Sequence, residues 1–255
     1  AVARLRETAA RTQAPLRAFL DARKVAYRSF WAANFIALKA DADLVDALAA
    51  RDDVAAIELE TRLTVERPAA EQPSGMKSVT AIETGVNQVN APSLWAMGFR
   101  GQNVRVAGAD TGYDWDHPAI IRQYAGSSGG TANHNFSWWD AIHSSGGTCP
   151  GNSAAPCDDN SHGTHTMGTI VGDDGGSNQI GVAPGARWIA CRNMDQGNGT
   201  PTTYTECFQF FLAPTDLAGN NPDPLRAPHV INNSWGCPPS EGCTTPNILQ
   251  TVVEN

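Results

Sequence analysis

Three short apolar segments constrain the fold of this chain most strongly. Asn103–Ala109, Ala186–Cys191 and His229–Asn232 each end in polar residues or glycine, as buried parallel strands do. Helical stretches lie between them, the clearest at His162–Val171 and Thr203–Leu212. Strands that alternate with helices predict an α/β fold with a doubly wound parallel sheet. In such a sheet, functional groups gather at the carboxyl ends of the strands.

The first 80 residues differ in composition from the rest of the chain. They carry 12 Lys and Arg against 11 Asp and Glu, whereas residues 81–255 carry 6 against 15. Only Gly75 of the 24 glycines, and none of the six cysteines, lies in this first part. We therefore expect two domains, 1–80 and 81–255.

The first domain is expected to be a small α+β unit. Helical patterns cover Val2–Arg23 and Asp41–Ala50. Val25–Leu38 is rich in β-branched and aromatic residues, and Val54–Val65 alternates like a half-buried strand, so both favour strands. Arg67–Lys77 then combines Pro, Gly and small polar residues, which predicts an exposed, protease-sensitive linker.

Composition excludes several classes of partner. The net charge of −8 argues against nucleic acid, because phosphate binding needs a basic surface. No apolar stretch is long enough for a membrane helix. The N-terminus AVARLRETAARTQ is too polar for a secretory signal, so we expect any signal peptide to have been removed already.

The cysteines lie in loop-rich sequence. Residues 126–157 form a long Gly/Ser-rich excursion with adjacent Trp138 and Trp139. Pairing by proximity gives Cys149–Cys157, Cys191–Cys207 and Cys237–Cys243, which favours an oxidising compartment. Six reduced cysteines remain the alternative. No CxxC spacing supports a zinc site.

Two short motifs carry side chains suited to catalysis. Asp110, in Ala109–Gly112, follows an apolar strand, where backbone donors can hold a carboxylate that points into a cleft. His162 enters the first turn of a predicted helix, flanked by small residues, which suits a general base. His162 and His165 could also be metal ligands, but the Glu of an HExxH helix is missing.

Two further segments could pair with an extended peptide. Val230–Gly236 is an apolar strand that ends in small polar residues, and Asp195–Gly199 is a flexible backbone segment. Each could equally be an ordinary turn.

Together, and in this order, the motifs resemble those of the subtilisin-like serine proteases, the subtilases. The matching segments are DTG with DHP at Asp116–Pro118, HGTHTMGTIVG, GVAPGA at 181–186, and VINNSWG. The SWWDAIH and CRNMDQGNGTP stretches are most similar to the bacillopeptidase F branch. The resemblance covers nearly the whole chain and implies a secreted endopeptidase that cleaves polypeptides.

The resemblance also implies roles for individual residues. Asp110 would orient the imidazole of His162, which would take a proton from a serine and return it to the leaving amine. The substrate backbone would lie between two strands, made of Ser234, Trp235 and Gly236 and of Gly197, Asn198 and Gly199. The remaining acidic and histidine residues of these motifs are assigned to structure: Asp114, Asp116, His117 and His165. No cofactor is needed for the chemistry. A structural calcium site is common in the family, and Asp173–Gln179 lies where one such loop falls, with oxygen ligands that suit a hard cation, although its spacing does not prove the site.

The first domain would then be the enzyme's own inhibitory propeptide. Residues 25–66 resemble the compact unit that templates folding and blocks the cleft of subtilases, and 67–82 would be the autoprocessing region. A purely structural N-terminal domain remains the alternative.

The chain departs from the family after the VINNSWG strand. Neither a GTSMA-like serine motif nor an AGN-like oxyanion motif follows that strand, where the resemblance would place both. We therefore expect a precursor fragment, inactive alone, whose missing C-terminal half is a partner. The alternative is a catalytically inert binding module, in which the propeptide inhibits or chaperones an intact protease.

Overall fold

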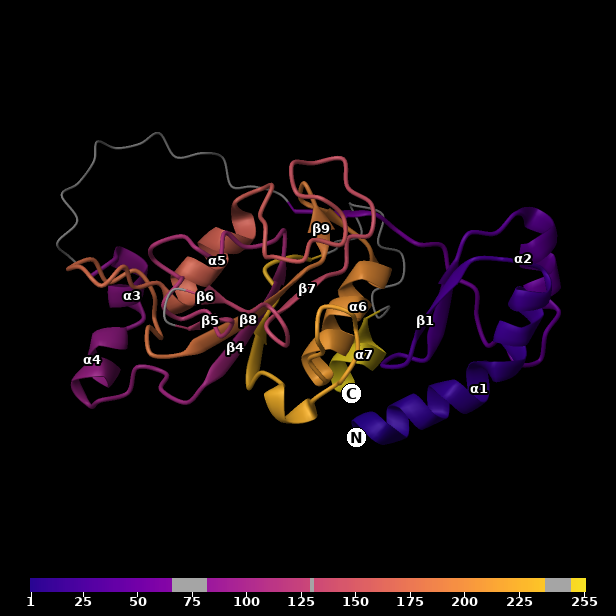
Figure 1. The fold of residues 1–255 in the computed structure, drawn as a ribbon, viewed down its shortest axis with the longest axis horizontal. Coiled ribbons are helices and arrows are strands. Elements are labelled where there is room, and N and C mark those ends of the chain that lie inside the picture. Colours follow the sequence, from indigo (N-terminus) through magenta and orange to yellow (C-terminus); the bar gives the residue numbers. More distant parts are fainter. Residues whose placement is uncertain (66–81, 129–130, 237–248) are drawn as a thin grey trace.

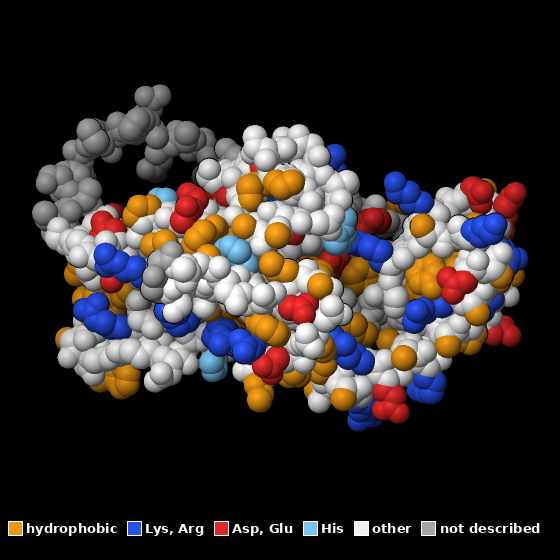
Figure 2. All heavy atoms as spheres, in the orientation of Figure 1, with side chains coloured by type: hydrophobic (Ala, Val, Ile, Leu, Met, Phe, Trp, Pro, Cys, Tyr) orange, Lys and Arg blue, Asp and Glu red, His pale blue; other side chains and the backbone are white. Residues whose placement is uncertain are grey.

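The computed structural model describes residues 1–65, 82–128, 131–236 and 249–255. An N-terminal unit, residues 1–65, lies beside a larger part that contains the main sheet (Figure 1). On the face drawn in Figure 2, acidic and basic side chains are interspersed over the N-terminal unit. The expected linker at 67–77 lies outside the described residues.

Helices and a hairpin make up most of the N-terminal unit. Helix α1 spans Val2–Ala22 and α2 spans Ala42–Ala49, which confirms both predicted helices. Asp41 caps α2 by accepting a hydrogen bond from the Leu44 amide at 2.9 Å.

The predicted strand at 25–38 is an antiparallel hairpin of two strands. These are β1 (Tyr27–Phe30) and β2 (Phe35–Leu38), and the Phe30 and Phe35 rings stack with centroids 4.6 Å apart. Asn34 turns the chain with a left-handed backbone (φ 52°), which short polar side chains tolerate.

The predicted strand at 54–65 is wrong for most of its length. Only β3 (Leu63–Thr64) is a strand, and residues 55–62 have no regular structure. Ile57 and Leu59 are 46% and 91% exposed, so the alternating pattern finds no surface to pack against until Leu63, which is buried.

The main sheet has four parallel strands in the order β11-β4-β8-β7. Their bounds are Val230–Asn232, Arg105–Asp110, Arg187–Arg192 and Trp138–Asp140. The parallel sheet confirms the α/β class and the three predicted strands. Strand β7 was missed, because its two tryptophans lie inside a Gly/Ser-rich segment.

Helices pack on opposite faces of this sheet. Helix α5 (His162–Val171) places Met167 and Val171 in a cluster with Val106 and Trp188. Helix α6 (Pro201–Leu212) places its residues Cys207, Phe210 and Phe211 in a cluster with alternate residues of the same strands: Ala107, Ala109, Ile189 and Cys191. Alternation along a strand sends successive side chains to opposite faces, so both faces are covered.

The other elements are short. A second sheet, β3-β10-β9, is antiparallel and contains β9 (Met194–Asp195) and β10 (Asn198–Gly199). The remaining elements are α3 (Thr84–Gln88), α4 (Ala91–Ala96), β5 (Ser127–Ser128), β6 (Thr131–Ala132), the 3-10 helix η1 (Pro224–Arg226) and α7 (Gln250–Glu254). Within the described ranges, every helix is too short or too polar to cross a membrane.

Two of the predicted disulfides are present. Cys149–Cys157 closes the end of the excursion, and Cys191–Cys207 joins β8 to α6. The third predicted pair, Cys237 and Cys243, lies outside the described residues.

Candidate active site

Asp110 and His162 meet at the carboxyl end of the sheet. Asp110 is the last residue of β4 and is fully buried, while His162 is the first residue of α5. The Nδ1 atom of His162 lies 2.7 Å from Oδ1 of Asp110. The Thr111 amide donates to the same oxygen at 2.7 Å. A buried carboxylate in this position fixes which imidazole nitrogen carries the proton and which one is left to act as a base.

Asp158 organises the start of helix α5, a role that sequence reasoning missed. Ser161 stands at the N-cap with a left-handed backbone (φ 68°) and makes no side-chain cap. Asp158 instead accepts from the amides of Ser161 and Thr164 at 2.8 and 2.9 Å, and from the Thr164 hydroxyl. It also accepts from the Thr111 hydroxyl at 2.9 Å. One carboxylate thus joins the strand that carries Asp110 to the helix that carries His162.

Glycine is required where this helix meets the strand end. A Cβ atom on Gly163 would lie 2.1 Å from the carbonyl oxygen of Gly112. Gly112 itself has a left-handed backbone (φ 119°), and a Cβ there would lie 1.8 Å from the Cys157 carbonyl oxygen. The DTG and HGT motifs therefore contain glycine because two backbones approach closely.

The segment 197–199 already pairs with another part of the chain. Strand β3 runs antiparallel to β10, with Thr64 opposite Asn198 and Leu63 opposite Gly199. The Val65 amide donates to the Gly197 carbonyl at 2.8 Å. The predicted substrate-pairing strand thus pairs with the end of the N-terminal unit.

Leu63 enters an apolar cluster between the two predicted peptide-binding segments. It is 2% exposed and packs with Met194 and Tyr204, and Trp235 borders the same cluster. The Trp235 ring stacks on Tyr204 with centroids 4.0 Å apart, and its Nε1 donates to the Ala109 carbonyl at 2.9 Å. Trp235 is therefore fixed over the end of β4, beside Asp110.

Ser234 and Gly236 lie on either side of Trp235 in the chain. The Ser234 hydroxyl accepts from Asn232 Nδ2 at 2.8 Å, and Gly236 is exposed with open space where a side chain would lie. Ser234, Trp235 and Gly236 begin one residue after β11, which is an edge strand of the main sheet among the described residues. A backbone in this position can accept an added strand.

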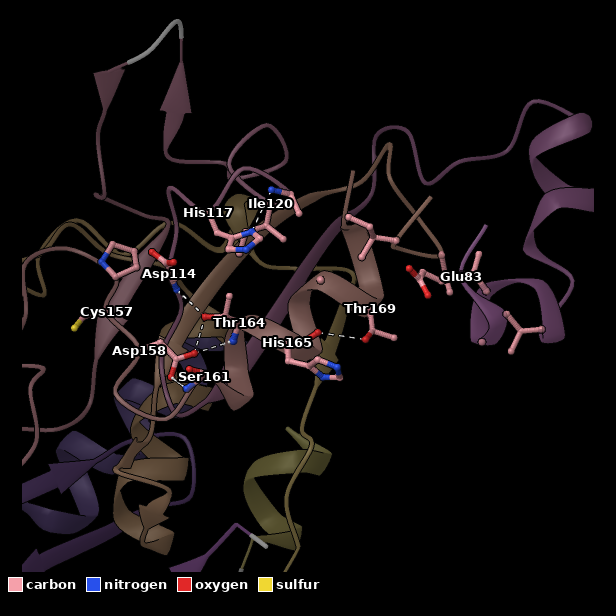
Figure 3. Close-up of a pocket in the computed structure, with 18 residues that line it drawn as sticks. Glu83, Asp114, His117, Ile120, Cys157, Asp158, Ser161, Thr164, His165 and Thr169 are labelled. Atoms are coloured by element: carbon pink, nitrogen blue, oxygen red, sulfur yellow. Dashed lines mark hydrogen bonds between the residues drawn. The ribbon is translucent and has the colours of Figure 1, made fainter. Parts of the chain in front are cut away.

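A groove of about 1110 Å³ runs along the exposed side of α5 (Figure 3). Asp114, His117, Asp158 and His165 lie on its wall, and Glu83 lies at its far end. Burial raises the pKa of Asp114, and the neighbouring Asp116 raises it further. In the part of the chain that the structure describes, no three His, Cys, Asp or Glu side chains gather closely enough to hold a metal.

The loop Asp173–Gln179 contains two carboxylates that already accept hydrogen bonds from the loop itself. Asp173 and Asp174 each accept a hydrogen bond from a loop amide, Gly175 and Gly176, at 2.7 Å. The Arg122 guanidinium lies where a side chain on Gly175 would stand, so a positive charge lies against the backbone of this loop. This donor set does not by itself form a calcium cage, and the ion stays a prediction.

Comparison with known proteins gives the family. The Subtilase family model matches residues 101–252. Bacillopeptidase F of Bacillus subtilis strain 168 is 42% identical over 165 residues, which are 63% of this chain and 11% of that protein. The major intracellular serine protease of the same strain is 34% identical over 122 residues, 48% of this chain and 34% of that protein. Subtilisin E, also from that strain, is 28% identical over 175 residues, 68% of this chain and 36% of that protein.

The chain therefore spans between about a tenth and about a third of the length of these relatives. The family match begins just before β4 and includes the strand that ends at Asp110 and the helix that begins at His162. This chain belongs to the subtilase family.

Proposed function

We propose that this chain is part of a secreted serine endopeptidase precursor. The observation that carries the proposal is the 2.7 Å contact between buried Asp110 and His162, at the carboxyl end of a parallel sheet in a subtilase. The nucleophilic serine and the oxyanion donor would come from the remaining part of the full-length protein. Residues 81–255 would then be the first part of a doubly wound catalytic domain.

Asp110 and His162 have different roles in proton transfer. Asp110 accepts the Nδ1 proton of His162 and holds the ring in one orientation. The Nε2 atom then carries no proton. It can take one from the serine hydroxyl as the serine oxygen attacks the peptide carbonyl. The imidazolium that forms is stabilised by the buried carboxylate and gives its proton to the leaving amine. No cofactor enters these steps.

The peptide would bind as an added strand between Gly197–Gly199 and Ser234–Gly236. The pairing of β3 with β10 supports this, because it places an extended backbone along Asn198 and Gly199 with an aliphatic side chain, Leu63, in the adjoining apolar cluster. Main-chain hydrogen bonds give such a site affinity for many sequences, and its pockets give preference.

The N-terminal unit would be the enzyme's own inhibitory propeptide, within residues 1–80. Besides β3, its β1 strand and the following turn contact α6. Arg28 pairs with Glu206 at 2.7 Å, and Gln209 Oε1 accepts from the amides of Trp31 and Ala32. A unit docked in this way occupies the strand edge that a substrate would need.

Disulfides support the extracellular part of the proposal. Disulfides such as Cys149–Cys157 and Cys191–Cys207 form and persist in oxidising compartments and are rare in the cytosol.

The test adds to this chain the part of the protease that would carry the serine and the oxyanion donor. Denaturing mass spectrometry of the natural source would identify any companion polypeptide that carries a GTSM-like segment, and this polypeptide would be co-expressed with residues 1–255. We expect hydrolysis of a peptide substrate by the pair, and none by either chain or by the His162→Ala pair. Hydrolysis that survives His162→Ala would contradict the proposal. A pair that assembles without hydrolysis would favour the inert binding module.

A further inference from the structure

A fully buried arginine lies beneath the hairpin that contains β9 and β10. Arg192 ends strand β8 and has no exposed surface. Its Nη2 atom lies 2.8 Å from Asp159 Oδ2 and 2.8 Å from Asp195 Oδ1, and its Nη1 atom lies 3.6 Å from Asp140 Oδ2. Its side chain also donates to the carbonyls of Pro150 and Met194. One guanidinium therefore contacts three carboxylates and two carbonyl groups.

The three carboxylates come from segments far apart in sequence, and each holds a loop. Asp140 ends β7 and accepts from the Ile142 and Ser153 amides at 3.0 and 2.7 Å. Asp195 ends β9 and accepts from the Ser145 hydroxyl and the Gly146 amide. Both therefore tie the disulfide-closed excursion to the guanidinium.

Asp159 makes the connection to the catalytic pair. It lies three residues before His162 and directly after Asp158, the residue that caps α5. Its Oδ1 accepts from the Gln196 amide at 3.0 Å while its Oδ2 contacts Arg192. The turn between β9 and β10 is thus attached to the loop that leads into His162.

The turn needs such support because a glutamine occupies the first of its two left-handed positions, where Asn, Asp or Gly is preferred. Gln196 and Gly197 are both left-handed, with φ of 50° and 83°. A left-handed Gln is unfavourable unless its surroundings hold it. The Asn198 side chain closes the turn by donating to the Asp195 carbonyl at 3.3 Å. The segment 197–199 is therefore anchored at its start by Asp159 and by Asp195, and both of these contact Arg192.

Burial makes the arginine hard to replace. Desolvation raises the pKa of Asp140 to about 6 and also raises the pKa of Asp159, so these carboxylates are costly to keep ionised without a cation beside them. Arginine supplies a planar fork that reaches several acceptors at once, which the single ammonium of lysine does not.

We propose that Arg192 is a positioning residue for the substrate: it holds the peptide-pairing segment 197–199 at a set distance from His162. This inference rests on the proposed function of that segment. The backbone of Arg192 lies opposite Asp110 in the sheet, whereas its guanidinium contacts Asp159 and Asp195, through which it acts on the segment 197–199.

Hydrogen exchange on the full 255-residue chain tests the positioning without any need for activity. Arg192→Met should speed exchange of the Val65 amide, which donates to Gly197, about tenfold relative to wild type, while the amides of β4 keep their protection. The matched control is Arg187→Met, at the other end of β8, whose guanidinium contacts the Arg122, Tyr124 and Ser127 carbonyls. It should leave Val65 unchanged. Equal loss of protection throughout β4, or no loss at Val65, would overturn the inference.

A second variant covers the case in which Arg192→Met does not fold. Asp195→Ala removes both acceptor oxygens, so it breaks the 2.8 Å contact with Arg192 in every orientation of the new side chain. The same selective loss at Val65 is expected, and unchanged exchange would count against the inference.

Kinetics of the full-length protease separate this inference from the proposed function. Arg192→Met should raise KM about tenfold for a peptide long enough to pair with 197–199, leave kcat within about twofold, and leave KM unchanged for a single-residue amide that cannot reach that segment. A lower kcat with unchanged KM would overturn the positioning role. A wild-type protein without hydrolysis would instead defeat the proposed function, and the exchange result would still stand.

Discussion

The amide of Val65 donates a hydrogen bond to the carbonyl of Gly197 at 2.8 Å, so the N-terminal unit and the larger part of the chain share a sheet. This contact joins β3 to the segment that we propose receives the substrate. Because β3 has only two residues, one backbone hydrogen bond is a large part of the pairing.

Replacing Val65 with proline should release β3. Proline has no amide hydrogen, and the loss of one hydrogen bond of about 1 kcal/mol should let trypsin cleave after Arg62 roughly five- to tenfold faster. Val65→Ala keeps the amide and is the matched control, for which we expect little change. Equal cleavage rates for the proline and alanine variants would contradict the importance of this hydrogen bond.

Asp110→Asn should separate folding from catalysis. Asparagine keeps the size of the side chain and one acceptor oxygen, but it cannot hold the imidazole in the orientation that a carboxylate imposes. We expect kcat of the full-length protease to fall by about 10⁴. Circular dichroism and the thermal midpoint check that the variant is folded, and unchanged turnover would remove Asp110 from the proposed pair.

Asp158→Ala should affect both stability and turnover. It removes the cap of α5 and the link between Thr111 and that helix. Loss of a helix cap costs about 1 kcal/mol, so denaturant unfolding should show at least that loss. We also expect kcat to fall at least tenfold, because His162 loses its alignment with Asp110.

A matched control for this variant exists in the N-terminal unit. Asp41→Ala removes the cap of α2 and should cost a similar unfolding free energy. It should leave turnover unchanged, since α2 lies away from the sheet. A similar fall in kcat for both variants would mean that the effect of Asp158 is only one of general stability.

His143 should make the stability of the protein depend on pH, through its contact with Glu206 of helix α6. Its Nε2 lies 3.0 Å from Glu206 Oε1, and Glu206 also pairs with Arg28. The hydrogen bond to Glu206 raises the pKa of His143 above 6.5, although burial opposes the shift. A raised folded-state pKa stabilises the protein fully below pH 6.5, and this stabilisation is lost as the pH rises through the folded-state value.

His143→Gln tests this dependence. The wild type should have a higher thermal midpoint than the variant at about pH 5.5, and the difference should shrink by about pH 8.5. Arg28→Gln is the comparison, because arginine keeps its charge over this range. A difference that does not change with pH would contradict the role of His143 protonation.

The sequence by itself determined the elements whose signals are local. The helices at 2–22, 42–49 and 162–171, and the strands that end near Asp110, Arg192 and Asn232, follow from periodicity and from the glycine-rich turns after them. The motifs likewise placed Asp110 and His162 at a strand end and a helix start. Two such positions meet in a parallel α/β sheet, which is why the pair could be predicted.

Only the tertiary structure decided what depends on contacts between distant segments. Residues 54–65 alternate like a strand, but they form one only at Leu63, where β10 supplies a partner. Trp138 is a sheet residue because it meets β8, although its flanking sequence resembles a loop. Asp158 and Arg192 carry no distinctive local pattern, since their roles come from carboxylates and amides that folding brings around them. Local chemistry therefore set the elements and the proposed catalytic pair, and burial of charged groups among separate loops fixed the position of the segment 197–199.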